Sequence, residues 1–264
     1  MKTRMIRIRK SGRTAGLWLY FSSQCHLAKS LQNTASFYIR NLRTGLLKEP
    51  DMRSANEAEV IRITEDAIRK YNENQHVLFC GKAVRTGKLL GKGALSAMTA
   101  ASQVIAKLQK LKVMPCPDEN HRMVSYEQLN AILYWSGNPD YFAMPSQVNQ
   151  QVLRKVIKSW AGYFESIKAY AKHPEVFTGI PRMPGYKRTP YSTVHYTNQV
   201  IKPVRSGGKL FLSFPDRSLE LCIGKEADCQ GIVKVEVKPS GREFTVLVTY
   251  TAEIPEPAVP KHPE

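Results

Sequence analysis

The hydrophobic period changes once along this chain, and that change limits the possible folds more than any other feature. Up to about residue 170, apolar side chains recur at helical spacing, as Val148, Val152 and Val156 do. From Tyr191 onward the period is two, in short β-rich runs divided by Gly or Pro turns. A helical block followed by short antiparallel strands predicts an α+β fold, in which the strands form a small barrel or sandwich.

The N-terminus also has strand character, because Ile6-Arg7-Ile8-Arg9 places apolar and basic side chains on opposite faces. This strand is expected to complete the C-terminal barrel, so that the helical bundle is an insertion. The predicted domains are residues 1–12, the first strand of the barrel; 13–172, the inserted helical domain; 173–254, the remaining strands; and 255–264, a proline-rich linker or tail.

Within the helical block, apolar spacing and capping signals predict several separate helices. The expected ranges are 18–47, 56–71, 94–111, 125–135 and a long segment from Pro145. Ser125-Tyr126-Glu127-Gln128 has the spacing of a capping box. Between the second and third ranges, the stretch Cys80 to Gly93 is rich in Gly, Lys and Arg but lacks phosphate-loop spacing. We expect a basic flexible loop there, or a plain solvated linker.

The charge of the chain favours a polyanionic partner. Lys and Arg number 39 against 22 Asp and Glu, which gives a formal charge of +17. The alternative is a basic protein whose charge serves only solubility. The sequence has no run of 18 apolar residues, and charges interrupt the N-terminus, so neither a membrane segment nor a signal peptide is expected. Five cysteines without a CxxC pair fit a cytoplasmic protein.

The helix predicted from Pro145 has a second face of amide and cationic side chains, which suits a phosphate backbone or base edges. A basic turn region follows it. The predicted contacts to the nucleic-acid backbone are Gln147, Gln151, Arg154, Lys155, Lys158, Arg182, Lys187 and Arg188. Tyr186, Tyr191 and Tyr196 interleave with the cations of the turn region. Two interpretations stay open for them: stacking on unpaired bases, or packing against the strands.

No catalytic signature is present in the sequence. The chain lacks Gly-x-Ser-x-Gly and His-Glu-x-x-His, and its six histidines have no metal-ligand spacing. His195 lies in the basic region, where it either contacts a phosphate or is simply packed or solvated. The residues alone therefore indicate a nucleic-acid-binding protein without an active site of its own.

Three motifs carry a resemblance to a known family. They are Pro145-Ser146-Gln147-Val148-Asn149-Gln150-Gln151-Val152-Leu153, Gly179-Ile180-Pro181-Arg182 and Tyr196-Thr197-Asn198. With the strands up to Pro255, they make the chain resemble the N-terminal half of the TnpB family, the transposon-encoded RNA-guided DNA endonucleases related to type V CRISPR effectors. The resemblance extends from about Tyr126 to Pro255.

This resemblance implies a wedge β-barrel with an inserted helical recognition domain, which together hold a guide RNA and read a short motif in double-stranded target DNA. The motif-reading positions that it implies are Tyr126, Ser146, Gln150, Thr197 and Asn198. Gln150 is the foremost of these, because an amide can both donate to and accept from an adenine edge. Ser146 stands where a longer basic residue can occur in the family.

The chain stops where the RuvC-like nuclease domain of the family is expected to begin. Mg²⁺ and Zn²⁺ are therefore expected only in that missing half, and this chain alone is expected to have no catalytic residues, metal or cofactor. Whether it belongs to an active enzyme stays open. The alternatives are a protein-only, repressor-like DNA-binding protein derived from a transposon, or one subunit of a split nuclease whose RuvC-like part is a separate chain.

Overall fold

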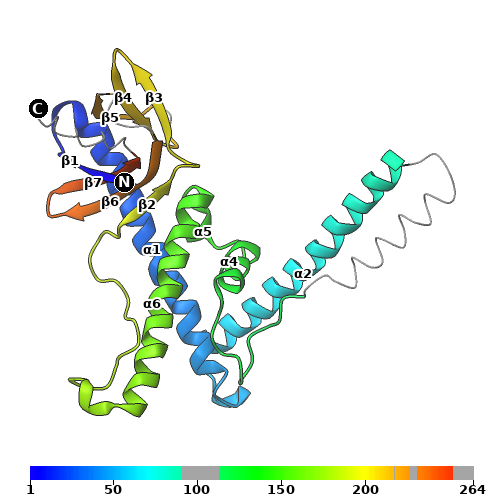
Figure 1. Cartoon of the computed structure of the whole chain (residues 1–264). Helices are drawn as coiled ribbons and strands as arrows, with labels where there is room; N and C mark the ends of the chain where they lie inside the picture. Colours follow the sequence, from blue (N-terminus) through cyan, green and yellow to red (C-terminus); the bar gives the residue numbers. More distant parts are fainter. Residues whose placement is uncertain (91–112, 217, 226–230, 252–264) are drawn as a thin grey trace, which may run out of the picture. The chain divides into compact units, whose positions relative to one another are not determined.

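The computed structural model describes residues 1–90, 113–216, 218–225 and 231–251, with the backbone alone for residues 76–90 (Figure 1). The described chain divides into two compact units. The strand unit contains Met1–Asn33, Ala143–Val156 and the described residues from Gly185 onward. The helical unit contains Thr34–Phe142 and Ile157–Pro184. Helices α1 (Ala15–Gly45) and α6 (Ser146–Lys172) contribute residues to both units.

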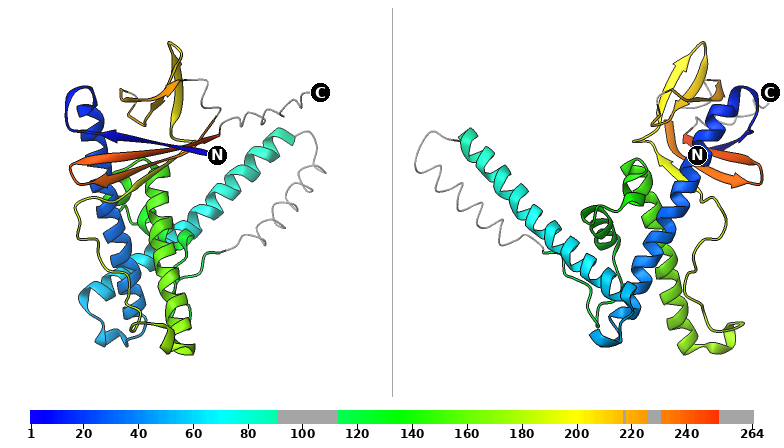
Figure 2. Two further views of the ribbon diagram at one scale, coloured as in Figure 1. Left: turned by 60° about the vertical axis from the view of Figure 1, so that its left-hand side comes forward. Right: turned by 180° about the vertical axis from the view of Figure 1, so that it is seen from behind.

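The strand unit contains two antiparallel sheets, which confirms the α+β class. The first has the order β1-β7-β6-β2, formed by β1 (Lys2–Ile8), β7 (Glu243–Thr251), β6 (Gly231–Ser240) and β2 (Val194–Thr197). Strand β1 pairs with β7 along its whole length, and Figure 2 shows these two strands side by side. The expectation that the first strand joins the later strands is therefore confirmed.

The second sheet has the order β3-β4-β5, formed by β3 (Lys202–Ser206), β4 (Lys209–Ser213) and β5 (Glu220–Lys225). Gly207 and Gly208 connect β3 to β4 with φ angles of 56° and 70°. A two-residue hairpin turn with positive φ at both positions requires residues such as glycine, so this dipeptide determines the register of the hairpin.

Aromatic side chains form the centre of the strand unit. The ring of Phe214, just after β4, lies 5.1 Å from Phe21 of α1 and 5.3 Å from Tyr196 of β2, measured between ring centroids. Phe21 also faces Phe244 of β7. Phe21, Tyr196, Phe214 and Phe244 are all buried. Large aromatic side chains from both sheets and from α1 thus share one apolar core.

The helical unit contains α2 (Ala55–Leu90), α4 (Tyr126–Trp135), α5 (Pro139–Phe142) and the remaining parts of α1 and α6. Short 3-10 turns occur at Gly12–Thr14, Pro50–Met52 and Pro174–Val176. The capping box of α4 is confirmed: the Gln128 backbone N–H donates to Ser125 Oγ at 3.1 Å, and the Ser125 N–H donates to Gln128 Oε1 at 2.9 Å. Helix α1 ends at Gly45, two residues before the end of the predicted range 18–47.

The expectation of a loop or linker from Cys80 is wrong up to Leu90, because α2 continues to that residue. A helix that has already formed adds residues without a new nucleation cost, and Lys, Arg, Leu and Ala are good helix formers. Gly81 and Gly87 each oppose this by only about 1 kcal/mol. The helix predicted over 94–111 lies outside the described residues.

Candidate nucleic-acid interface

A cluster of positive side chains lies on one face of the first sheet of the strand unit. Residues 234, 236 and 238 of β6 alternate and therefore point to the same face, and His195 of β2 pairs directly with Glu236. The charges of Glu236, Lys238 and Lys187 all affect the pKa of Lys155 in α6. We therefore add Lys155 to the group, together with Lys187 from the loop before β2. We call Lys155, Lys187, His195, Lys234 and Lys238, with Glu236 at their centre, the basic cluster.

Glu236 is the carboxylate at the centre of this cluster. Lys234 Nζ lies 2.7 Å from Glu236 Oε1, and Lys238 Nζ lies 3.2 Å from Glu236 Oε2. His195 Nδ1 lies 3.9 Å from Glu236 Oε1. The hydrogen bond from Lys234 is the main reason why the pKa of Glu236 is lowered, so Glu236 stays ionised. The cluster nevertheless contains four lysines and this one carboxylate, which leaves it with an excess of positive charge.

Burial and like charge together lower the pKa values of two basic groups in the cluster. The pKa of Lys155 is lowered, first by partial desolvation and then by the like charge of Lys187. Burial is also the main cause of the lowered pKa of His195, and repulsion from Lys155, Lys234 and Lys238 adds to it. A polyanion would relieve this repulsion, so the electrostatics of the cluster favour phosphate groups as ligands.

A pocket of about 470 Å³ adjoins the cluster. Two of its lining residues, Lys187 and Lys238, belong to the cluster, and Thr193 adds a hydroxyl group. The hydroxyl groups of Thr189 and Tyr191, which also line it, already bond to the Tyr191 carbonyl and to Ser22. Ammonium and hydroxyl groups are common donors to phosphate oxygens in protein complexes with nucleic acids. The pocket therefore offers a place for a phosphate at one edge of the basic cluster.

Helix α1 holds the loop that carries Lys187. Asn33 accepts the backbone N–H of Lys187 at 2.7 Å and donates its amide to the carbonyl of Lys187 at 3.2 Å. Further along, Ser192 donates its N–H to the carbonyl of Cys25 at 2.9 Å and its hydroxyl to Gln32 at 2.7 Å. These bonds fix the loop backbone before any ligand binds, which lowers the entropy cost of binding.

The amphipathic character predicted for α6 is confirmed. Val148, Val152, Val156 and Trp160 are buried, whereas Arg154, Lys155 and Lys158 are exposed and Gln147, Gln150 and Gln151 are half-buried. Lys155 joins the basic cluster, and Lys158 belongs to the helical unit. Asn149 is also buried, with 1 % of its surface exposed. Of the other predicted backbone contacts, Arg188 is exposed in the strand unit and Arg182 is exposed in the helical unit.

The predicted motif-reading residues divide between the two units. Ser146, the exposed first residue of α6, and Gln150, one turn further, belong to the strand unit, as do Thr197 and Asn198. Thr197 pairs with Lys234 across β2 and β6, next to the basic cluster, and Asn198 is exposed beyond the end of β2. Tyr126 begins α4 in the helical unit.

The two interpretations of the tyrosines, stacking on bases or packing against the strands, apply to different residues. Tyr196 is fully buried and packs on Phe214. The ring of Tyr191 lies 5.6 Å from Phe244, and its hydroxyl lies 3.0 Å from Ser22 Oγ. Tyr186 is 45 % exposed. Packing therefore accounts for Tyr191 and Tyr196, and Tyr186 is the one of the three with a surface open to a base.

Lys234, Glu236 and Lys238 were not predicted as site residues. Their signal is present in the sequence, because Lys234-Val235-Glu236-Val237-Lys238 alternates charged and apolar residues in a run recognised as a strand. Such alternation places the three charges on one face, although it does not identify the neighbouring strand or helix.

Among the described residues, no group of three or more His, Cys, Asp or Glu side chains is placed to hold a metal ion. Within the same residues, no helix has the length and apolar character needed to cross a membrane. A scan against protein-family models finds no match, and no curated protein matches the chain.

Proposed function

We propose that this chain is the guide-RNA-binding and target-motif-reading module of a TnpB-like RNA-guided DNA endonuclease, acting in the cytoplasm and without catalytic residues of its own. The basic cluster is the observation that carries the proposal. It contains four lysines and one carboxylate, and desolvation together with like-charge repulsion lowers the pKa of Lys155 and of His195. Polyanion binding is the function that this arrangement supports best.

The fold supports the same proposal in its order of elements. A first strand pairs with the last strand, and the long helices lie between them in sequence, as a wedge domain with an inserted recognition domain requires. Closure of the two sheets into one barrel belongs to this proposal. The reading of a DNA motif by Tyr126, Ser146, Gln150, Thr197 and Asn198 belongs to it too, as do backbone contacts by Arg154, Lys155 and Lys158 of α6.

The test is to express the protein beside its own locus and to sequence the RNA that copurifies with it. The proposal expects one dominant RNA, released steeply as salt rises. A preparation free of RNA, with no RNA retained at low salt, would contradict it. Sequence-selective binding of duplex DNA after complete RNase treatment would instead indicate a protein-only DNA-binding protein. Mg²⁺-dependent cleavage only after addition of a separate RuvC-like chain would identify a split nuclease.

A further inference from the structure

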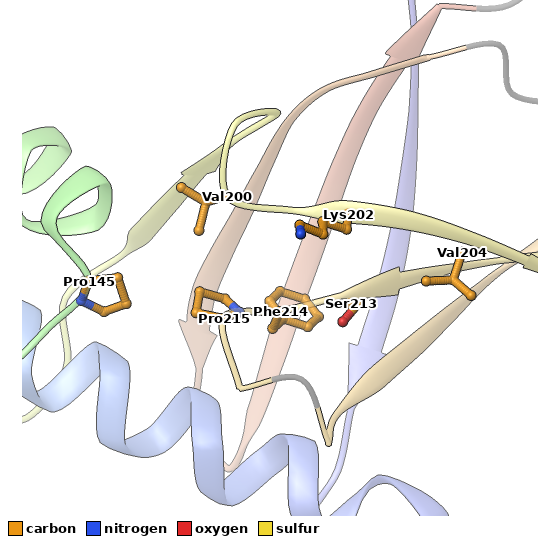
Figure 3. Close-up of a pocket in the computed structure, with 7 residues that line it drawn as sticks. All are labelled: Pro145, Val200, Lys202, Val204, Ser213, Phe214 and Pro215. Atoms are coloured by element: carbon orange, nitrogen blue, oxygen red, sulfur yellow. The ribbon is translucent and has the colours of Figure 1, made fainter.

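A second pocket, of about 410 Å³, lies in the strand unit where β3 begins (Figure 3). Its walls are mostly apolar and come from Pro145, Val200, Val204, Phe214 and Pro215. Small-molecule sites in proteins typically measure roughly 300 to 1,000 Å³, with apolar walls and a few polar groups. This pocket is thus large enough for a flat heterocycle, and the proline rings give it rigid apolar surfaces.

Two polar side chains enter the same pocket. Lys202 and Ser213 lie directly opposite each other on β3 and β4, so both project from one face of the sheet. Figure 3 shows both side chains near the ring of Phe214. An ammonium and a hydroxyl group can donate hydrogen bonds to the carbonyl oxygens and ring nitrogens of a nucleobase.

The chain connects this pocket closely to the basic cluster. Strand β2 carries His195 and Thr197, and a tight turn then leads to Lys202. In that turn the N–H groups of Val200 and Ile201 donate to the carbonyl of Thr197 at 3.1 and 3.2 Å. The cluster and the pocket therefore belong to the same compact unit and are joined by this short turn.

A peptide is a poorer occupant for this pocket. Strand β3 is an edge strand, and such an edge can add a strand from another chain. Pro203 in the middle of β3 has no N–H to donate, however, and the exposed cations Lys202 and Arg205 flank it. Proline and positive charge on an edge disfavour strand addition, and the same charge favours a phosphate-bearing ligand.

We infer that this pocket receives one unpaired nucleobase of the strand bound at the basic cluster, with Lys202 and Ser213 as its hydrogen-bonding partners. The inference rests on the proposed nucleic-acid binding. A base in an apolar pocket adds affinity that does not depend on salt, whereas phosphate contacts at the cluster add affinity that does.

The experiment compares two single strands of about ten nucleotides, oligothymidylate and a strand of equal length that is abasic at every position. Both carry the same phosphates. Wild-type protein should bind the thymidine strand about tenfold more tightly, because only that strand has a base to place in the pocket. Val204→Phe fills the pocket and should reduce this ratio to near one, with an unchanged salt dependence. Val233→Phe, at a half-buried position of β6 outside the pocket, is the matched control.

Lys202→Met provides a second variant that keeps the apolar stem and removes the donor, so it should lower the ratio severalfold even if Val204→Phe does not fold. Equal wild-type affinity for the two strands would overturn the inference. So would a ratio that Val204→Phe and Lys202→Met leave unchanged, the result expected if the pocket takes a peptide. If neither strand binds with salt-dependent affinity, the proposed function fails instead.

Discussion

Neutralising Lys187 and Lys238 together tests the basic cluster most directly. Both line the 470 Å³ pocket, and Lys238 also pairs with Glu236. We expect Lys187→Gln/Lys238→Gln to lose two phosphate contacts. Each contact contributes about 0.7 (single strand) to 0.9 (duplex) to the slope of log K against log salt, so the slope should become shallower by about 1.4 to 1.8.

The expected loss of affinity follows from that slope. Between about 50 and 200 mM salt, wild-type affinity should fall about tenfold more than that of the double variant. At about 0.1 M salt the variant should bind roughly 25 to 60 times more weakly, a difference that disappears as salt approaches about 1 M. Fluorescence anisotropy with one labelled RNA at several salt concentrations measures both quantities.

The matched control is Lys70→Gln/Lys168→Gln, which changes the net charge equally. These lysines pair with Asp66 and Glu165 on exposed helical surfaces. The control should keep the wild-type slope. Parallel salt dependences for wild type and the Lys187→Gln/Lys238→Gln variant would refute the assignment of the cluster as a phosphate site, and so would an equal loss in the control.

Three further predictions concern single residues. Gln150→Ala should lose about 1 to 3 kcal/mol of discrimination between matched and scrambled DNA motifs. It should change the free energy of unfolding by less than about 0.5 kcal/mol, because Gln150 is half-buried on the polar face of α6. Unchanged discrimination in filter binding would exclude this role. The hydrogen bond from Lys48 is the main cause of the low pKa of Glu57, which is about 2 against an ordinary 4.5. The ionised Glu57 carboxylate therefore contributes its full stability above pH 4.5, and this contribution disappears as pH falls towards 2. Glu57→Gln should cost about 1 to 3 kcal/mol near neutral pH and remove that acid sensitivity in urea titrations, whereas an unchanged pH profile would contradict the assignment. Bound phosphates should raise the lowered pKa of His195, so the affinity for RNA should increase as pH falls through the pKa of the bound form. NMR titration of the His195 ring with and without RNA measures the shift. An identical pKa in both states would place the ligand elsewhere.

The sequence predicts elements better than it predicts their neighbours. The helical spacing of Val148, Val152 and Val156 identifies α6 and its buried face, and the Ser125 capping box identifies the start of α4. These signals are local, so nearby residues are sufficient. The continuation of α2 to Leu90 was missed, because the glycines suggested a loop while the cooperativity of a long helix is not visible in a short window.

The basic cluster was found only in part, for a related reason. Lys155 and Lys187 attract attention as cations in polar segments, but Lys234 and Lys238 lie in a strand that looks like ordinary half-buried sheet. Their grouping depends on the pairing of β2 with β6 and on the contacts of α6, which are separated from them by dozens of residues. Periodicity shows which face a residue occupies, and it contains no information about what lies opposite.

Glu236 explains how such a cluster can exist in the absence of a ligand. Lysines that approach one another without an opposite charge repel and destabilise the fold, and this repulsion adds to the desolvation that lowers the pKa of Lys155. Glu236 lies between Lys234 and Lys238 in sequence and bonds to both, so it reduces the repulsion where the sheet brings these two lysines together. It contributes one negative charge against four positive ones, and the remaining charge is left for a ligand. A surface evolved for solubility alone would gain nothing from concentrating lysines in this way, whereas a surface that binds phosphates gains affinity from each uncompensated charge.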